Sequence, residues 1–150
     1  MQWNQKETQL LKDLKGQEQL CVDKYMHHAE AACDPQLKNL FSQLAQQEAQ
    51  HLQTISQMES GTIPQMSSGG GQSQPSFTAA YSGDSKEKQN DCYLCSDTLT
   101  GEKHVSGLYD TCVFEFRDAQ ARNVLNHIQK EEQEHGKMLY DYMNANGMYQ

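Results

Sequence analysis

The sequence predicts an all-α protein, a four-helix bundle built from two similar helical hairpins joined by a long crossover. Three observations lead to this prediction. Apolar residues recur at alternating steps of three and four in four separate segments, as on one face of a helix. A stretch rich in Gly, Ser, Gln and Pro, at residues 61–90, separates these segments into two pairs. The two pairs also match each other without a gap when residue n is aligned with residue n + 84.

Size and composition fit one domain. With 150 residues the chain can bury one sizeable core, so we expect a single domain over 1–150, with hairpins at 3–60 and 91–146 and the crossover at 61–90. The net charge of -8 argues against nucleic acid and anionic lipid as partners, since both attract clustered Lys and Arg. No apolar run is long enough for a signal peptide or a membrane span, which predicts synthesis in the cytoplasm.

Each hairpin contains a short motif that starts its second helix. The first motif is Asp34-Pro35 and the second centres on Asp118. Asp is a favoured N-cap residue, and Pro suits the first position of a helix. Both places therefore predict a tight reversal followed by a new helix.

Polar residues interrupt the middle of every apolar stripe. Because the helical period directs each stripe toward the core, these polar side chains should meet inside the bundle. They also survive the internal duplication, since Glu18 aligns with Glu102, and the first Glu-x-x-His motif aligns with the second. The six residues are Glu18, Glu48, His51, Glu102, Glu132 and His135.

Four carboxylates inside one apolar core need a counter-charge, because burying even one bare charge costs roughly several kcal/mol. No Lys or Arg lies on the stripes near these glutamates, and two histidines cannot neutralise four carboxylates. Bound divalent metal would supply the charge, and oxygen ligands with some imidazole suit iron or manganese better than structural zinc. One Glu from each of two helices and Glu-x-x-His from the other two form a known pattern for a two-metal site, so the sequence predicts two Fe or two Mn ions.

The last segment offers alternatives to Glu132. Glu131 and Glu134 flank it in the same EEQEH run. The first copy carries Gln47 and Gln50 at the positions that match these two glutamates, whereas the glutamate at the Glu132 position repeats. The duplication therefore selects Glu132.

Two long segments of the second half resemble the spore coat protein F family of endospore-forming bacteria, within the ferritin-like di-metal proteins. They are DCYLCSDTLTGEKHVSGLYDTCVFEFRD and RNVLNHIQKEEQEHGKMLYDYMNANGMY. The first half resembles the family less closely. The resemblance implies a ferritin-like bundle in the spore coat, with other coat proteins or further copies of the chain as partners.

The resemblance also implies roles for the site residues. Tyr25 and Tyr109 resemble the tyrosines of rubrerythrin-type proteins that hydrogen-bond a ligand carboxylate. Rubrerythrins that reduce peroxide carry one more carboxylate where this chain has Val105, which makes that particular mechanism a poorer match. The implied ligands are Glu48 and Glu132 as bridges between the metals, Glu18 and Glu102 as terminal ligands, and His51 and His135 as ligands of one metal each.

Three functions are compatible with these residues. The first is an oxidoreductase of peroxidase or catalase type, with peroxide or dioxygen as substrate. The second is a structural coat component in which metal only stabilises the bundle. The third is a metal-sequestering protein without turnover.

Five cysteines at irregular spacing do not suit a disulfide framework. Cys92 and Cys95 could form a redox pair or half of a zinc site between chains. A single Cys-x-x-Cys carries little information, and we expect Cys95 to pack in the core and Cys92 to be half-buried.

Overall fold

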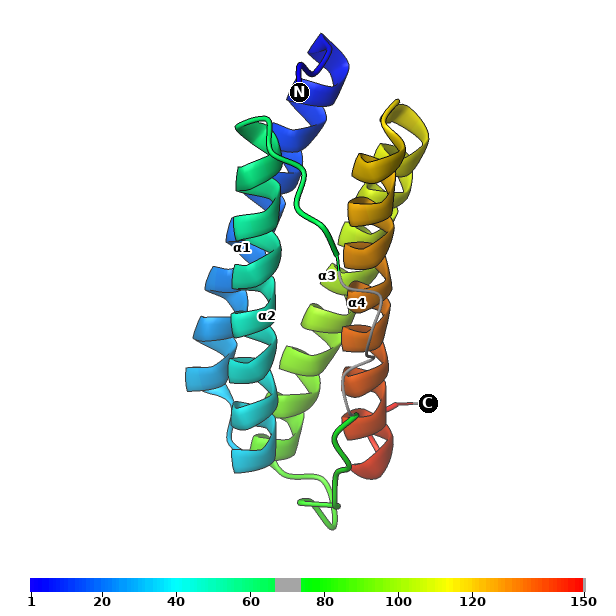
Figure 1. Ribbon diagram of the computed structural model, residues 1–150. Helices are drawn as coiled ribbons and strands as arrows, with labels where there is room; N and C mark the ends of the chain where they lie inside the picture. Colours follow the sequence, from blue (N-terminus) through cyan, green and yellow to red (C-terminus); the bar gives the residue numbers. More distant parts are fainter. Residues whose placement is uncertain (67–73, 150) are drawn as a thin grey trace.

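The computed structural model describes residues 1–66 and 74–149, and these form an all-α four-helix bundle (Figure 1). Helix α1 packs along α2, and α3 packs along α4; the two hairpins meet through contacts of α1 with α3 and of α2 with α4. The fold class predicted from the sequence is confirmed. The helices are α1 (Gln5–Ala31), α2 (Pro35–Glu59), α3 (Lys86–Glu115) and α4 (Ala119–Ala145).

The connection between the hairpins joins opposite ends of the bundle. In Figure 1, α2 ends at the top, near the N-terminus, whereas α3 starts at the bottom. Residues 60–66 leave the first of these ends, and residues 74–85 lead into the second. Helices α2 and α3 therefore point in the same direction, as the predicted crossover requires.

Side-chain caps set where the helices begin. The carboxylate of Asp34 accepts from the backbone N–H of Gln36, with Pro35 as the first residue of α2, and the carboxylate of Asp118 caps α4 by accepting from the backbone N–H of Ala121. Helix α3 begins at Lys86, inside the stretch that the sequence assigns to the crossover, because the Ser85 hydroxyl accepts from Lys88 N at 3.1 Å. Residues 86–90 are polar, so the spacing of apolar residues could not predict that they are helical.

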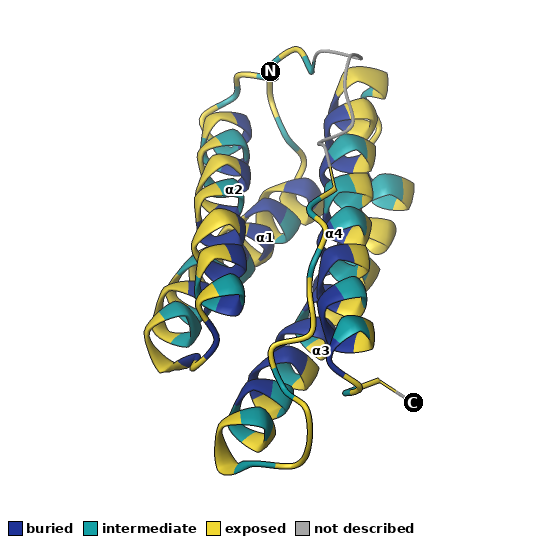
Figure 2. Cartoon of the chain, turned by 90° about the horizontal axis from the view of Figure 1, so that it is seen from below, coloured by how far each residue is buried: buried dark blue, intermediate teal, exposed yellow. Residues whose placement is uncertain are grey.

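The sides of the helices that face one another are buried, and the outer sides are exposed (Figure 2). The predicted stripes run from Leu11 to Ala32, Leu37 to Met58, Cys95 to Phe116 and Ala121 to Tyr142. All stripe residues, at alternating steps of three and four, are buried except Cys21 and His28, which are half-buried. The apolar core has two clusters, one containing Phe41 and Tyr142 and the other containing Ile55 and Phe116. None of the helices in the described residues is long and apolar enough to cross a membrane.

A buried carboxylate from each hairpin holds the turn of the other hairpin. Asp91 Oδ1 accepts from Cys33 N at 2.8 Å, and its Oδ2 accepts from Asp34 N at 2.9 Å. Glu7 Oε2 accepts from Arg117 N at 3.0 Å. Glu7 and Asp91 are 84 residues apart in the chain, so the duplication repeats this contact as well. These contacts fix how the two hairpins sit against each other.

Candidate metal centre

The six polar residues of the stripes lie together in the middle of the bundle, between the two apolar clusters. Helices α1 and α3 each supply one glutamate, and α2 and α4 each supply a glutamate and a histidine one turn apart. Glu102 is the most exposed of the six, at 4 %, so all are shielded from bulk water. The sequence therefore predicted correctly that Glu18, Glu48, His51, Glu102, Glu132 and His135 are buried together.

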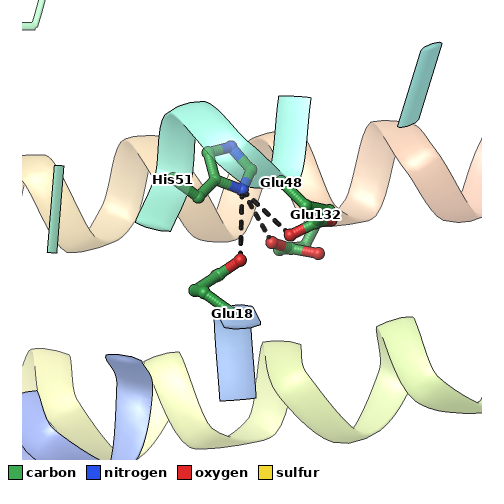
Figure 3. Close-up of side chains that lie close together, drawn as sticks. All are labelled: Glu18, Glu48, His51 and Glu132. Atoms are coloured by element: carbon green, nitrogen blue, oxygen red, sulfur yellow. Dashed lines mark hydrogen bonds and ion pairs between the residues drawn. The ribbon is translucent and has the colours of Figure 1, made fainter. Parts of the chain in front are cut away.

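One half of the cluster forms around His51 (Figure 3). Its Nδ1 lies 2.9 Å from Glu132 Oε1, 3.3 Å from Glu48 Oε2 and 3.8 Å from Glu18 Oε2. One potential ligand atom from each of these four residues lies within 4.8 Å of all the others. This set of three carboxylates and one imidazole has the size and donor types of a metal-binding group.

The other half forms around His135 and repeats the first half. The Nδ1 atom of His135 lies 2.9 Å from Glu48 Oε1, 3.3 Å from Glu102 Oε1 and 3.8 Å from Glu132 Oε2. These four residues also offer ligand atoms within 4.8 Å of one another. Glu48 and Glu132 belong to both halves, each with one oxygen toward each histidine. The two imidazole rings stack with centroids 5.7 Å apart.

Two buried tyrosines contact the terminal glutamates across the bundle. Tyr25 on α1 donates to Glu102 Oε1 at 2.6 Å, and Tyr109 on α3 donates to Glu18 Oε1 at 2.5 Å. Each phenol thus holds a carboxylate of the opposite hairpin. Burial raises the pKa of both tyrosines well above the usual value, and the negative charge of the contacted glutamate raises it further. Both phenols therefore remain hydrogen-bond donors at neutral pH.

The outer nitrogen of each histidine also has a partner. His51 Nε2 lies 3.0 Å from Glu131 Oε1, and His135 Nε2 lies 2.6 Å from Gln47 Oε1. The hydrogen bond with His51 lowers the pKa of the Glu131 carboxyl. This carboxylate is therefore ionised and acts only as an acceptor. Both Nε2 atoms must then be donors, and in the neutral rings Nδ1 is left free for a metal.

Sequence reasoning used Glu131 and Gln47 only to select Glu132 and did not find their contacts. A signal was present, because the two positions are 84 residues apart and both residues have a side-chain oxygen that can accept a hydrogen bond. Their position one residue before the repeated glutamates placed them off the stripes. Contacts across the α2–α4 interface depend on the packing of the two helices and could not be derived from one helix alone.

The carboxylates and imidazoles share protons in the metal-free cluster. Burial would lower the pKa of His51, but hydrogen bonds and charges from Glu131, Glu48 and Glu18 raise it to about 10. In the same way, Glu102 and Glu48 raise the pKa of His135 to about 9 against the effect of burial. Both rings are therefore protonated on both nitrogens, and so positively charged, at neutral pH when no metal is bound.

The glutamates respond in opposite directions. Burial, together with its neighbour Glu48, raises the pKa of Glu18 well above the usual value, and burial beside Glu102 does the same for Glu132. Burial would also raise the pKa of Glu48, but hydrogen bonds with Glu18 and the two histidines hold it well below the usual value. Protons thus take the place of a cation and reduce the repulsion between the carboxylates.

Three carboxylate oxygens in the cluster accept no hydrogen bond from an N–H group or a phenol of the described residues, so only carboxyl protons shared between glutamates reach them when no metal is bound. They are buried, and an orphaned buried oxygen is costly unless another group satisfies it. Each belongs to a different glutamate, and each of these glutamates is in at least one four-residue group. Metal ions would satisfy these oxygens, so the residues present fit bound metal. The three atoms are Glu18 Oε2, Glu102 Oε2 and Glu132 Oε2.

The cysteines and His28 lie outside the cluster. Cys95 is fully buried in the apolar core, Cys92 is half-buried near Met148, and all five cysteines are free thiols. His28 contacts Asp97 Oδ2 at 2.8 Å. None of these residues is in either four-residue group that can hold a metal.

Residues 90–150, which contain most of α3 and all of α4, match a family model described as Coat F domain. No curated protein and no solved structure matches the chain. The resemblance to the spore coat protein F family is thereby confirmed for the second half of the chain.

Proposed function

We propose that this chain, which carries a Coat F domain over residues 90–150, is a spore coat component that binds two iron or two manganese ions inside its helical bundle. Glu48 and Glu132 would contribute a ligand to each metal, since both belong to both ligand groups. Glu18 and Glu102 act as terminal ligands, and His51 and His135 each bind one metal through Nδ1. Other coat proteins or further copies of the chain are its partners, and the exposed rings of Tyr93 and Phe114 suit such contacts.

The observation that carries the proposal is the set of orphaned carboxylate oxygens within two overlapping ligand groups. A cluster built only for packing would satisfy its buried oxygens with hydrogen-bond donors. Here the available donors, the two phenols and two imidazoles, leave three oxygens without a partner among the described residues. Divalent cations provide both the missing contacts and the missing charge.

Peroxide or dioxygen is the proposed substrate of the metal pair. Bound iron or manganese would supply the electrons that reduce such an oxidant. The chain itself orients the ligands: Tyr25 and Tyr109 hold the terminal carboxylates, and Glu131 and Gln47 hold the imidazoles. Burial of the six residues limits their contact with bulk water.

A second candidate function is purely structural, with metals that only hold the four helices together. The low exposure of all six residues, at most 4 %, favours it, since structural metal sites have their ligands turned away from solvent. Metal sequestration without turnover is the third possibility, with the same ligands.

Metal loading followed by oxidant addition separates these functions. Protein purified without oxygen is offered Fe(II) or Mn(II), freed of excess metal, and assayed for metal per chain and for loss of added peroxide. We expect about two metal ions per chain and faster peroxide loss than with the metal-free protein. Metal without peroxide loss would support the structural or sequestering function, and fewer than about one metal per chain would contradict the metal site itself.

Metal binding is expected to release protons and to tighten as pH rises. The pKa of His51 is raised to about 10 and that of His135 to about 9, so metal must displace both protons at about pH 7. Calorimetric titration in two buffers with different ionisation enthalpies measures this release, and we expect about two or more protons per chain. An equal apparent enthalpy in both buffers would show that the ligands are already deprotonated.

The same shifts predict how stability depends on pH. Since the pKa of both histidines is raised above the value of 6.5, their contribution to the metal-free protein is complete below that pH and is lost as pH rises through about 9 and 10. The melting temperature of the metal-free protein should therefore fall over this range. In the metal-loaded protein, metal replaces the second proton of each histidine, so the melting temperature should fall less over this range.

A further inference from the structure

The internal duplication makes the two hairpins similar, but the surfaces above their glutamates differ. Between α3 and α4 lies a groove of about 390 Å³ that reaches the cluster. The residues that line it include Glu102 and Glu132, one glutamate of the cluster from each helix. Both residues carry an orphaned buried oxygen. The walls are formed by Leu99, Lys103, Ser106, Gln133 and Gly136.

Small side chains open this groove. Gly136 has no side chain, and a Cβ atom at this position would lie 3.6 Å from Leu99 Cδ1, so a larger residue would extend into the groove. On the first hairpin, the residues that match Ser106 and Gly136 are Val22 and Leu52, both of them larger and apolar. At these two positions the α3–α4 side has the smaller residue, whereas Gln133 of the groove matches the smaller Ala49.

The first hairpin has a pocket of its own, which does not reach the cluster. It lies between α1 and α2 and is lined by residues such as Met26, Ser42 and Ala49, with none of the six cluster residues among them. The glutamates differ in the same direction, since Glu102 is 4 % exposed and Glu18 is 0 % exposed, although His51 of the first hairpin, at 3 %, is more exposed than His135.

We propose that divalent metal ions reach the buried cluster through the α3–α4 groove and bind first to Glu102 and Glu132, which line it. This inference rests on the proposed metal site and adds the route by which the site is loaded. The orphaned oxygens of the two glutamates attract a cation at the inner end of the groove. Lys103 at the wall is the one opposing charge among the residues that line it, and it slows the passage of cations.

Stopped-flow loading of the whole metal-free protein with Mn(II) or Co(II) tests this route, with the rate of uptake as the readout. Gly136→Leu should slow uptake roughly tenfold and leave the final metal content unchanged, since the ligands stay in place. Lys103→Gln should speed uptake about threefold at low salt, because it removes a positive charge from the groove.

Two matched variants serve as controls. Gly107→Leu makes the same substitution on α3 at an exposed position with open space around it, and it should load like wild type. Gln19→Lys places a positive charge at the position of the first hairpin that matches Lys103, and it should not change the rate either.

The outcomes separate this route from the proposed function. Equal uptake rates in wild type and Gly136→Leu would overturn the route, as would slower uptake in Gln19→Lys. If the wild-type protein takes up no metal at all, both the metal site and the route are wrong. Slower uptake in Gly136→Leu with full final loading supports the groove as the path.

Discussion

A Glu48→Gln, Glu132→Gln double variant is expected to lose iron and manganese binding while its four helices remain folded. Each of the two glutamates belongs to both ligand groups, so each metal position loses two of its four protein ligands. We expect the affinity to fall more than about a thousandfold and the metal content to drop from about two ions per chain to nearly none. Metal analysis after anaerobic loading measures the loss, and circular dichroism measures the helices.

Glutamine keeps the shape of the side chain and removes the charge that must be neutralised in the core. In the metal-free protein, however, Glu48 pairs with both protonated histidines, so the variant should melt below the metal-free wild type while its four helices still form. Glu134→Gln is the matched control, because it removes one carboxylate from the same EEQEH run but lies outside both ligand groups. Full metal loading of the double variant would mean that the metal binds elsewhere.

Replacement of Asp91 by alanine should have the largest effect on the stability of the fold. Asp91 is fully buried and accepts hydrogen bonds from the backbone N–H groups of Cys33 and Asp34 and from the Tyr81 hydroxyl. Alanine leaves these donors without their acceptor at the junction of α1, α2 and α3. We expect a loss of about 3 kcal/mol in the free energy of unfolding, or roughly 10 °C in melting temperature.

Chemical denaturation of the metal-free protein measures this loss without a contribution from metal. Asp110→Ala on the exposed side of α3 is the control for removing an aspartate from this helix, and it should change stability by less than about 0.5 kcal/mol. A similarly small effect of Asp91→Ala would show that water replaces its contacts and that the carboxylate does not hold the turn.

The sequence predicted the bundle and the buried cluster because both follow from periodicity. Apolar residues at steps of three and four fix which side of each helix is buried, and the duplication shows which polar residues share that side. Glu132 illustrates this: its two neighbouring glutamates were set aside, and it is the one that lies among the ligand groups. The ligand roles of the six residues and the identity of the metals stay predictions.

Other features depend on how helices pack and could not be read from one stripe at a time. Glu131 reaches His51 from the next helix, and the groove at Gly136 exists because a small residue faces Leu99 across the α3–α4 interface. The sequence placed Asp91 at the start of the second hairpin and gave it no role. Asp91 matches Glu7 in the duplication, and each of the two carboxylates accepts a backbone hydrogen bond from the turn of the other hairpin. Comparing polar residues beyond the stripes at the same offset would have found this pair.

Diffraction from crystals of the manganese-loaded protein tests the metal pair most directly, because an anomalous difference map locates each metal ion without reference to activity. We expect two peaks in the middle of the bundle, with Glu48 and Glu132 beside both. One peak should also contact Glu18 and His51, and the other Glu102 and His135. A map with peaks only at surface carboxylates, or none within the bundle, would contradict the two-metal site.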